Sequence, residues 1–229
     1  MQPVRSTHTQ GTAPAPGAAS QALSTNAVLR NTYWLLSLTL LFSALCAWVG
    51  MQMNFGGVGI LGFFVGAYGL MFLTHKLRNS VWGLAAVFAF TGFFGFMLAP
   101  MLNIYLTAVP NGGQLVLTAL GGTGLIFLGL SAYALASGRR FNNWGASLMA
   151  LGIVAMIAMA ANIFMQIPAL SMAVSALFML FSSAVIIYQT GEIVHGGETN
   201  YISATVTLFV SLYNIFVSLL SLLGMGGDE

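Results

Sequence analysis

Charge is what this sequence of 229 residues has least of. Only 4% of the side chains are Lys, Arg, Asp or Glu, whereas 58% of the residues are hydrophobic. A soluble domain of this size needs far more polar and charged surface to remain in water. The composition therefore excludes a soluble domain and indicates an integral membrane protein. The net charge of +2 is also too small to indicate a nucleic-acid partner.

Histidine, aspartate and lysine side chains are missing from the hydrophobic segments. His8, His75 and His195 all lie outside them, the only Asp is Asp228, and no Lys follows Lys76. These absences exclude an intramembrane serine protease with a His base, an intramembrane aspartyl protease and a retinal protein with a Lys in its last helix. They also count against a proton-coupled carrier, because pumps usually carry ionisable groups in mid-membrane. We therefore expect no catalytic activity and no cofactor.

Cysteine and metal-ligand clusters are equally scarce. The single Cys46 lies in the first hydrophobic segment, which excludes an internal disulfide and predicts a small apolar packing residue. Glu192, His195 and Glu198 form the only acidic and histidine cluster, spaced three apart across a Gly-Gly break. Glu198 and Asn200 come just before a hydrophobic segment, where acidic and capping residues favour a helix start. The cluster therefore predicts a cytoplasmic loop or helix cap rather than a metal site.

Seven hydrophobic segments approach the roughly 20 residues that cross a bilayer. Short connections between them predict one compact all-α membrane domain, residues 28–229. Residues 1–27 have no apolar core and are rich in Thr, Ala, Pro, Gly and Ser, which predicts a flexible cytoplasmic tail and no cleavable signal peptide. The predicted spans are Thr32–Met53, Gly56–Thr74, Val81–Ala99, Leu115–Ser137, Trp144–Met165, Pro168–Gln189 and Tyr201–Leu223.

The basic residues predict the orientation. With seven spans, all six fall on one side of the membrane, which the positive-inside rule places in the cytoplasm. The N-terminus is therefore predicted to be cytoplasmic, and the C-terminus with Asp228 and Glu229 to lie outside. The cluster of Glu192, His195 and Glu198 falls on the cytoplasmic side, and acidic residues contribute little to the rule. The basic residues are Arg5, Arg30, Lys76, Arg78, Arg139 and Arg140.

A polar stripe follows the last hydrophobic segment. At ~100° per helical residue, its members fall within roughly 80° of arc. An unpaired polar group is costly in hydrocarbon, so the stripe should face protein or a narrow wet cavity, which predicts a central last helix. The stripe consists of Asn200, Ser203, Thr207, Ser211, Asn214, Ser218 and Ser221.

The sixth segment carries a matching polar face. Spacings of 4, 7 and 7 residues place its members on one side of a helix, and we predict that this side bonds to the stripe of the last helix. Such bonds contribute about 0.6 to 2 kcal/mol each in a membrane. The face consists of Ser171, Ser175, Ser182 and Gln189.

Glycines, prolines and amides predict details of packing. Pro100 and Pro168 are expected to flank helix ends. The amides Asn103, Asn162 and Gln166 are expected to cap helices or bond between them. Glycines that predict close helix packing are Gly62, Gly66, Gly92, Gly95, Gly121, Gly122 and Gly124.

Several strings together resemble a known family. HGGETNYI followed by VSLYNIFVSLLSLLG resembles the C-terminal signature of the Bax inhibitor (transmembrane Bax-inhibitor motif) family. The likeness extends over nearly all of residues 28–224. The strings most resemble a bacterial branch of the family that includes an inner-membrane modulator of the protease FtsH. The upstream strings are VLRNTYWLLSLTLLFSA, AYGLMFLT, AFTGFFGFMLAPMLNIYL and ALGGTGLIF.

The resemblance implies a fold of six helices around a central seventh, in the bacterial inner membrane. It implies that the protein is both a partner and a poor substrate of the ATP-dependent membrane protease FtsH. By occupying the protease, the protein would restrain the degradation of other membrane proteins. Its further partners would be lipid and the membrane regulators of the protease. A tail of ~27 residues could extend on the order of 90 Å, enough to reach a cytosolic ATPase ring. The alternative is that the tail is an inert terminus.

Other family members are described as pH-gated calcium leak channels with a pair of Asp as sensor. In this sequence the two sensor positions fall on Gln189 and Ser211, neither of which ionises. A calcium or cation leak is therefore the competing hypothesis, with Gln189, Ser211 and Asn214 along the path and a gate altered to depend on Glu192 or His195. A purely structural bundle without a ligand is a third alternative.

Overall fold

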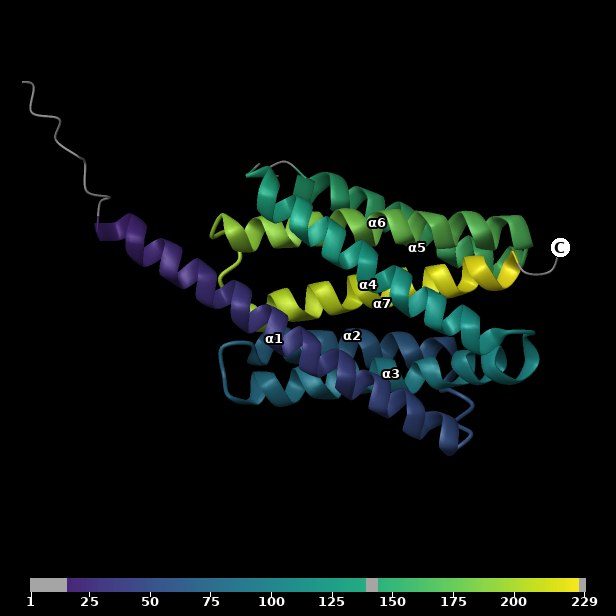
Figure 1. Ribbon diagram of the computed structural model, residues 1–229. Helices are drawn as coiled ribbons and strands as arrows, with labels where there is room; N and C mark the ends of the chain where they lie inside the picture. The colour runs from purple at the N-terminus through teal and green to yellow at the C-terminus, as the bar shows by residue number, and fades with distance from the viewer. Residues whose placement is uncertain (1–15, 139–143, 227–229) are drawn as a thin grey trace, which may run out of the picture.

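The computed structural model describes residues 16–138 and 144–226, which form seven α-helices (Figure 1). Each helix contains a stretch long and apolar enough to cross a bilayer. The predicted all-α class with seven spans is confirmed. The helices are α1 (Pro16–Gln52), α2 (Gly59–Leu77), α3 (Trp82–Ala108), α4 (Gly112–Ser137), α5 (Trp144–Met165), α6 (Pro168–Val194) and α7 (Tyr201–Met225).

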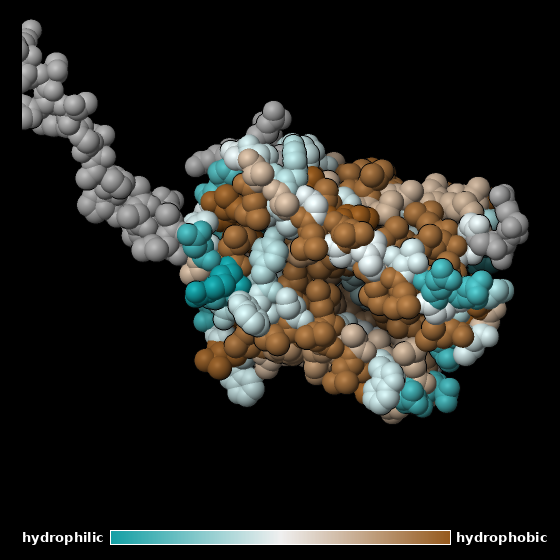
Figure 2. Space-filling view, viewed as in Figure 1, coloured by the Kyte–Doolittle hydropathy of each residue, from teal (hydrophilic) through white to brown (hydrophobic). Residues whose placement is uncertain are grey.

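The surface matches a bilayer. Hydrophobic side chains cover the middle of the face shown in Figure 2, and hydrophilic residues gather toward the two ends of the bundle. Large apolar side chains such as Leu61, Leu125 and Phe164 are 82%, 73% and 87% exposed. Exposure of this extent is unfavourable in water but matches the apolar environment of lipid chains. The chain is therefore a membrane protein.

Helix α7 lies in the middle of the bundle. It packs against α1, α2, α3, α4 and α6, and several of its side chains are fully buried. Helix α5 contacts only α6, so five helices rather than six surround the seventh. The buried apolar side chains of α7 include Ile202, Leu208, Phe209, Ile215 and Leu220.

Aromatic rings join α3 to α7 at the centre. The ring of Phe94 contacts that of Tyr213 edge to face, with centroids 4.9 Å apart and planes at 86°. Phe94 also meets Phe209 at 6.1 Å, and Phe90 meets Phe209 at the same distance. Edge-to-face pairs of this kind add about 0.5 to 1.5 kcal/mol beyond the burial of their area. These contacts fix α7 against the inner face of α3.

The structure changes the interpretation of α1 and α3 most among the helix boundaries. Helix α1 begins at Pro16, so residues 16–27 are helical where a flexible tail was predicted, and the remainder of that tail, residues 1–15, lies outside the described residues. Helix α3 continues through Pro100 to Ala108. A proline costs a helix one hydrogen bond, but a membrane helix tolerates this where neighbouring groups satisfy the backbone. Pro168 does begin α6, as predicted.

The predicted close packing of glycines is confirmed at some positions and wrong at others. A Cβ on Gly66 would overlap the ring of Phe93, and one on Gly95 would overlap the backbone carbonyl of Ser43. These two glycines allow α3 to approach α2 and α1 closely, as predicted. A Cβ on Gly121 or Gly124 of α4 would meet nothing within 4 Å, so close packing was a wrong prediction there. Sequence spacing does not reveal which face of α4 meets a neighbour.

Candidate functional site

The turn between α6 and α7 is closed by backbone hydrogen bonds. Helix α6 runs through Glu192 to Val194, and the backbone N–H groups of Gly197 and Glu198 both donate to the Glu192 carbonyl, at 2.8 and 3.2 Å. Gly196 has a φ of +75°, a left-handed conformation that glycine adopts at helix C-termini without strain. The predicted loop is therefore a tight turn, and Glu192 belongs to the helix before it.

Asn200 connects this turn to a second one. Its side-chain oxygen accepts hydrogen bonds from the backbone N–H groups of Ile202 and Ser203, which makes it the N-cap of α7. Its amide nitrogen donates to the Arg78 carbonyl at 3.1 Å and to Asn79 Oδ1 at 2.8 Å. The predicted cap is confirmed, and one amide also fastens the α2–α3 turn to the start of α7.

His195 and Glu198 have structural partners rather than a shared ligand. His195 Nδ1 lies 2.8 Å from the Gly191 carbonyl and Nε2 lies 3.3 Å from the Gly138 carbonyl, which joins the end of α6 to the end of α4. Glu198 Oε1 accepts from the Asn200 backbone N–H at 2.8 Å. Within the described residues, no three His, Cys, Asp or Glu side chains come together to hold a metal ion.

The middle of the α7 stripe bonds mainly to its own helix. Thr207 Oγ1 donates to the Ser203 carbonyl at 3.1 Å, and Ser211 Oγ donates to the Thr207 carbonyl at 2.9 Å. The Asn214 amide has no hydrogen bond to any described residue. The prediction of a stripe bonded to α6 is therefore wrong for this region. A hydroxyl on a helix can reach the carbonyl four residues earlier and needs no second helix.

The two ends of the stripe do reach other elements. Ser175 of α6 donates to Ser221 at 3.3 Å, which confirms one predicted bond between α6 and α7. At the other end, Arg78 donates to Ser203 Oγ at 3.4 Å. Ser171 instead donates to Asn162 Oδ1 of α5 at 2.9 Å, which confirms the predicted interhelical role of that amide.

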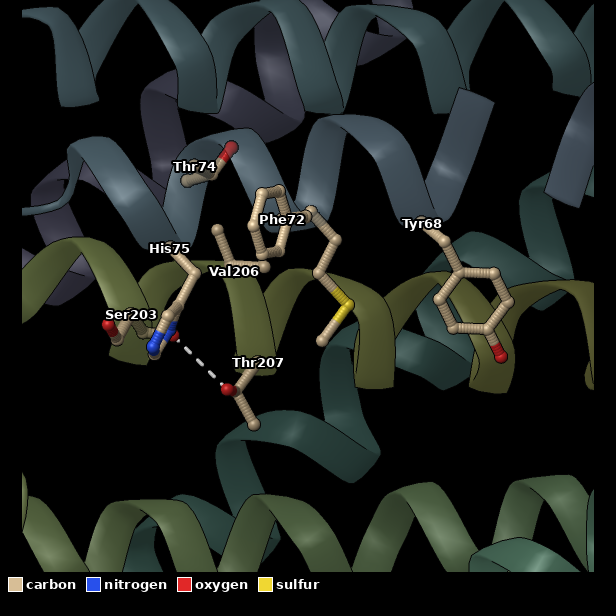
Figure 3. A pocket seen from close by; sticks show the side chains of 8 residues that line it. Tyr68, Phe72, Thr74, His75, Ser203, Val206 and Thr207 are labelled. Carbon is tan, nitrogen blue, oxygen red and sulfur yellow. Dashed lines mark hydrogen bonds between the residues drawn. The ribbon is translucent and has the colours of Figure 1, made fainter. Parts of the chain in front are cut away.

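Part of the stripe lies in an open seam between α2 and α6. These two helices do not contact each other, and Ser211 and Ser218 are buried, whereas the outer residues are only half-buried. A cleft of about 300 Å³ lies between α2 and α7 at the Ser203 end (Figure 3). A second hollow at the opposite end is lined by residues of α2, α5, α6 and α7. We call the four outer residues the polar seam: Ser203, Thr207, Asn214 and Ser221.

Several buried polar atoms of α1, α4 and α6 have no hydrogen-bond partner among the described residues. Gln189 Nε2 and Ser182 Oγ of α6 are buried without a hydrogen-bond partner among the described residues. Four further buried oxygens share this property, and unpaired buried polar atoms usually mark a place for bound water or an ion. The sequence pattern did not indicate these four oxygens, because each belongs to an isolated hydroxyl outside the predicted polar faces. The four are Thr32 Oγ1, Tyr33 Oη, Ser131 Oγ and Thr190 Oγ1.

An apolar cleft of about 340 Å³ opens between α1 and α4. Helices α1 and α4 do not contact each other, and the side chains of α7 form the floor of this cleft, including Phe209, Leu212 and Phe216. Its walls carry almost no polar groups. The cleft offers space for apolar chains, but the side chains that line it include no His, Cys, Asp, Glu, Lys or Arg.

Comparison with known proteins identifies the family. A family model described as inhibitor of apoptosis-promoting Bax1 matches residues 25–228, which includes all seven predicted spans. The chain belongs to the Bax inhibitor family. The sequence resemblance predicted this membership from the strings in α1 to α4 and in α7, and the match confirms it.

Three bacterial relatives can be aligned with this chain over most of its length. The modulator of FtsH protease YccA of Escherichia coli is 54% identical over 90% of this chain and 94% of its own length. An uncharacterised protein of Pseudomonas aeruginosa is 48% identical over 93% and 96% of the two chains. An uncharacterised membrane protein of Vibrio cholerae is 42% identical over 90% and 92%.

Proposed function

We propose that this protein modulates the membrane-bound, ATP-dependent protease FtsH in the bacterial inner membrane, without catalysis of its own. The observation that carries the proposal is the 54% identity to a modulator of FtsH protease over nearly the whole of both chains. The chain binds the protease as a poor substrate and so restrains the degradation of other membrane proteins. The N-terminus is cytoplasmic and the C-terminus periplasmic.

The shape of α1 supports this role. Its 37 residues are about 55 Å long, against a hydrocarbon core of about 30 Å. Figure 1 shows its first turns projecting beyond the other helices. Residues 1–15 precede this projection, and we propose that an ATPase ring grips this end of the chain. The bundle behind it resists extraction because all seven helices lie in the membrane and pack on one another.

The turn between α6 and α7 is the second proposed contact with the protease or its membrane regulators. Glu192, His195 and Glu198 lie at the same end of the bundle as the α1 projection, since α1 enters and α6 leaves the membrane there. Hydrogen bonds from this turn to the α2–α3 turn hold it in one conformation. A rigid turn presents its carboxylates at fixed positions to a partner, which reduces the entropy lost on binding.

The test follows protein lifetimes in cells. The full chain is overexpressed, and the half-life of a known membrane substrate of FtsH is measured after synthesis is stopped. We expect that half-life to lengthen. Deletion of residues 1–15 should lengthen the lifetime of this chain itself, because the ATPase loses the end that it grips. An unchanged substrate half-life on overexpression of the full chain would refute the proposal.

A calcium or cation leak is the second candidate function. The buried unpaired polar atoms support it, Gln189 Nε2 among them, because such atoms on α1, α4 and α6 can hold water or hydrate an ion. The substitutions at Gln189 and Ser211 argue against gating by a proton-sensing Asp pair. Calcium flux into liposomes loaded with a calcium dye tests this candidate. A flux equal to that of protein-free liposomes rules it out.

A further inference from the structure

The cleft between α2 and α7 has a polar end and an apolar end. Ser203 and Thr207 of α7 lie opposite His75 of α2 at the polar end. Tyr68, Met71 and Phe72 line the remainder from α2. Figure 3 shows the side chains of α2 extending across α7, with His75 beside Ser203 and Tyr68 far from both. The cleft is thus amphipathic along its length.

The depth of these groups matches the boundary of a membrane. Ser203 and Thr207 lie about 3 and 9 Å along the axis from the first residue of α7, at 1.5 Å per residue. On α2, His75 is two residues from the last helical residue, and Tyr68 lies about 10 Å farther into the membrane. The polar end therefore lies at the level of lipid head groups, and the apolar end lies within the hydrocarbon.

Positive charge is available at the polar end. The Arg78 guanidinium donates to the Oγ of Ser203, a residue that lines the cleft, at 3.4 Å. Within residues 16–138 and 144–226, no carboxylate pairs with Arg78 or His75. The nearby Glu198 carboxylate accepts instead from the Asn200 backbone. The charge of Arg78 thus remains available for an anion.

We propose that this cleft binds one anionic phospholipid. Arg78 and His75 hold the phosphate, and the Ser203 hydroxyl donates a further hydrogen bond to it. One acyl chain lies along Tyr68, Met71 and Phe72. The cleft opens sideways to the bilayer because α2 and α6 do not contact each other, so lipid reaches it without crossing the bundle. Basic pockets between membrane helices recognise anionic head groups in this way.

The test measures bound lipid on the full chain by native mass spectrometry in detergent. The probes are phosphatidylglycerol and phosphatidylcholine with identical acyl chains. We expect retention of one phosphatidylglycerol, favoured roughly fivefold over phosphatidylcholine, the factor that one basic side chain supplies near an anionic lipid. Arg78→Gln should abolish the preference. Lys76→Gln removes an equal charge from an exposed residue that makes no hydrogen bond to a residue of the cleft, and it should preserve the preference.

Two further variants and one competing soluble phosphate extend the lipid-binding experiment. Met71→Trp fills the cleft without a change in charge and should release the lipid, and Ser203→Ala should weaken its retention. These variants decide the question if Arg78→Gln does not fold. Equal losses in Arg78→Gln and Lys76→Gln would show general surface attraction and overturn the proposal. Displacement of the lipid by excess glycerol phosphate would also overturn it, by identifying a site for a soluble phosphate.

Discussion

Polar residues of the same type in this bundle differ in whether they have a hydrogen-bond partner on another helix. The Asn162 amide accepts from Ser171 and joins α5 to α6, whereas the Asn214 amide lies half-buried in the polar seam with no bond to a described residue. Both are Asn residues in membrane helices. Their environments differ because Asn162 has a hydroxyl of α6 within hydrogen-bond distance, whereas Asn214 has no such partner among the described residues.

This contrast predicts that the same substitution lowers the stability of the bundle at Asn162 but not at Asn214. Asn162→Leu removes an interhelical bond and should lower the stability of the bundle by about 0.6 to 1.7 kcal/mol. Asn214→Leu should leave stability unchanged, because this half-buried amide makes no hydrogen bond to a described residue that the substitution could remove. Thermal unfolding in bilayer discs measures both variants. A loss for Asn214→Leu as large as that for Asn162→Leu would show that the Asn214 amide is bonded within the fold.

At the scale of elements, the start of α7 has side-chain bonds that the starts of α2, α3, α4 and α6 lack. The side chain of Asn200 accepts two bonds from the first turn of α7 and donates two to the α2–α3 turn. By contrast, the N-cap residues of α2, α3, α4 and α6 make no side-chain capping bond. One residue therefore sets both where α7 begins and how it meets α2.

Replacement of this cap should loosen two segments together. Asn200→Ala removes all four side-chain bonds, and the loss of an N-cap alone costs about 1 kcal/mol. We expect faster amide hydrogen exchange in the first turn of α7 and in the turn around Asn79. Asn79→Ala removes one of the four bonds and serves as the control, with a smaller effect confined to its own turn. Unchanged exchange at α7 in Asn200→Ala would contradict the assigned role.

At the scale of the whole molecule, the described residues form a bundle that is open on more than one side of its central helix. One opening, between α1 and α4, is apolar, and another, between α2 and α6, exposes the polar seam. The outer surface between the ends is hydrophobic, as Figure 2 shows for one face. Charged side chains therefore decide the orientation of the bundle rather than its shape.

The proposed orientation can be measured by cysteine labelling. Cys46 is first replaced by Ala, since it is the only native cysteine. Ser80→Cys then places a thiol in the α2–α3 turn, and Pro110→Cys places one in the α3–α4 turn, both at exposed positions. A thiol reagent that cannot cross membranes should label Pro110→Cys in spheroplasts and Ser80→Cys only after lysis. The reverse pattern would place the N-terminus outside.

The amino-acid sequence by itself determined the class, the number of spans and the family. Long apolar runs can only be helices in a bilayer, because every backbone group must bond within its own segment. The cap at Asn200 was also predictable, since an N-cap depends on residues two and three positions away. Properties of this kind depend on neighbours in the chain, and the sequence contains them.

Only the tertiary structure decided which polar groups meet another helix. The periodicity of α7 identified a polar face but not its neighbour, and the gap between α2 and α6 leaves part of that face open. The same limit explains why Gly95 lies in a close contact and Gly124 does not. Contacts between helices depend on their relative rotation and tilt, which arise from packing over the whole bundle. No single segment specifies them.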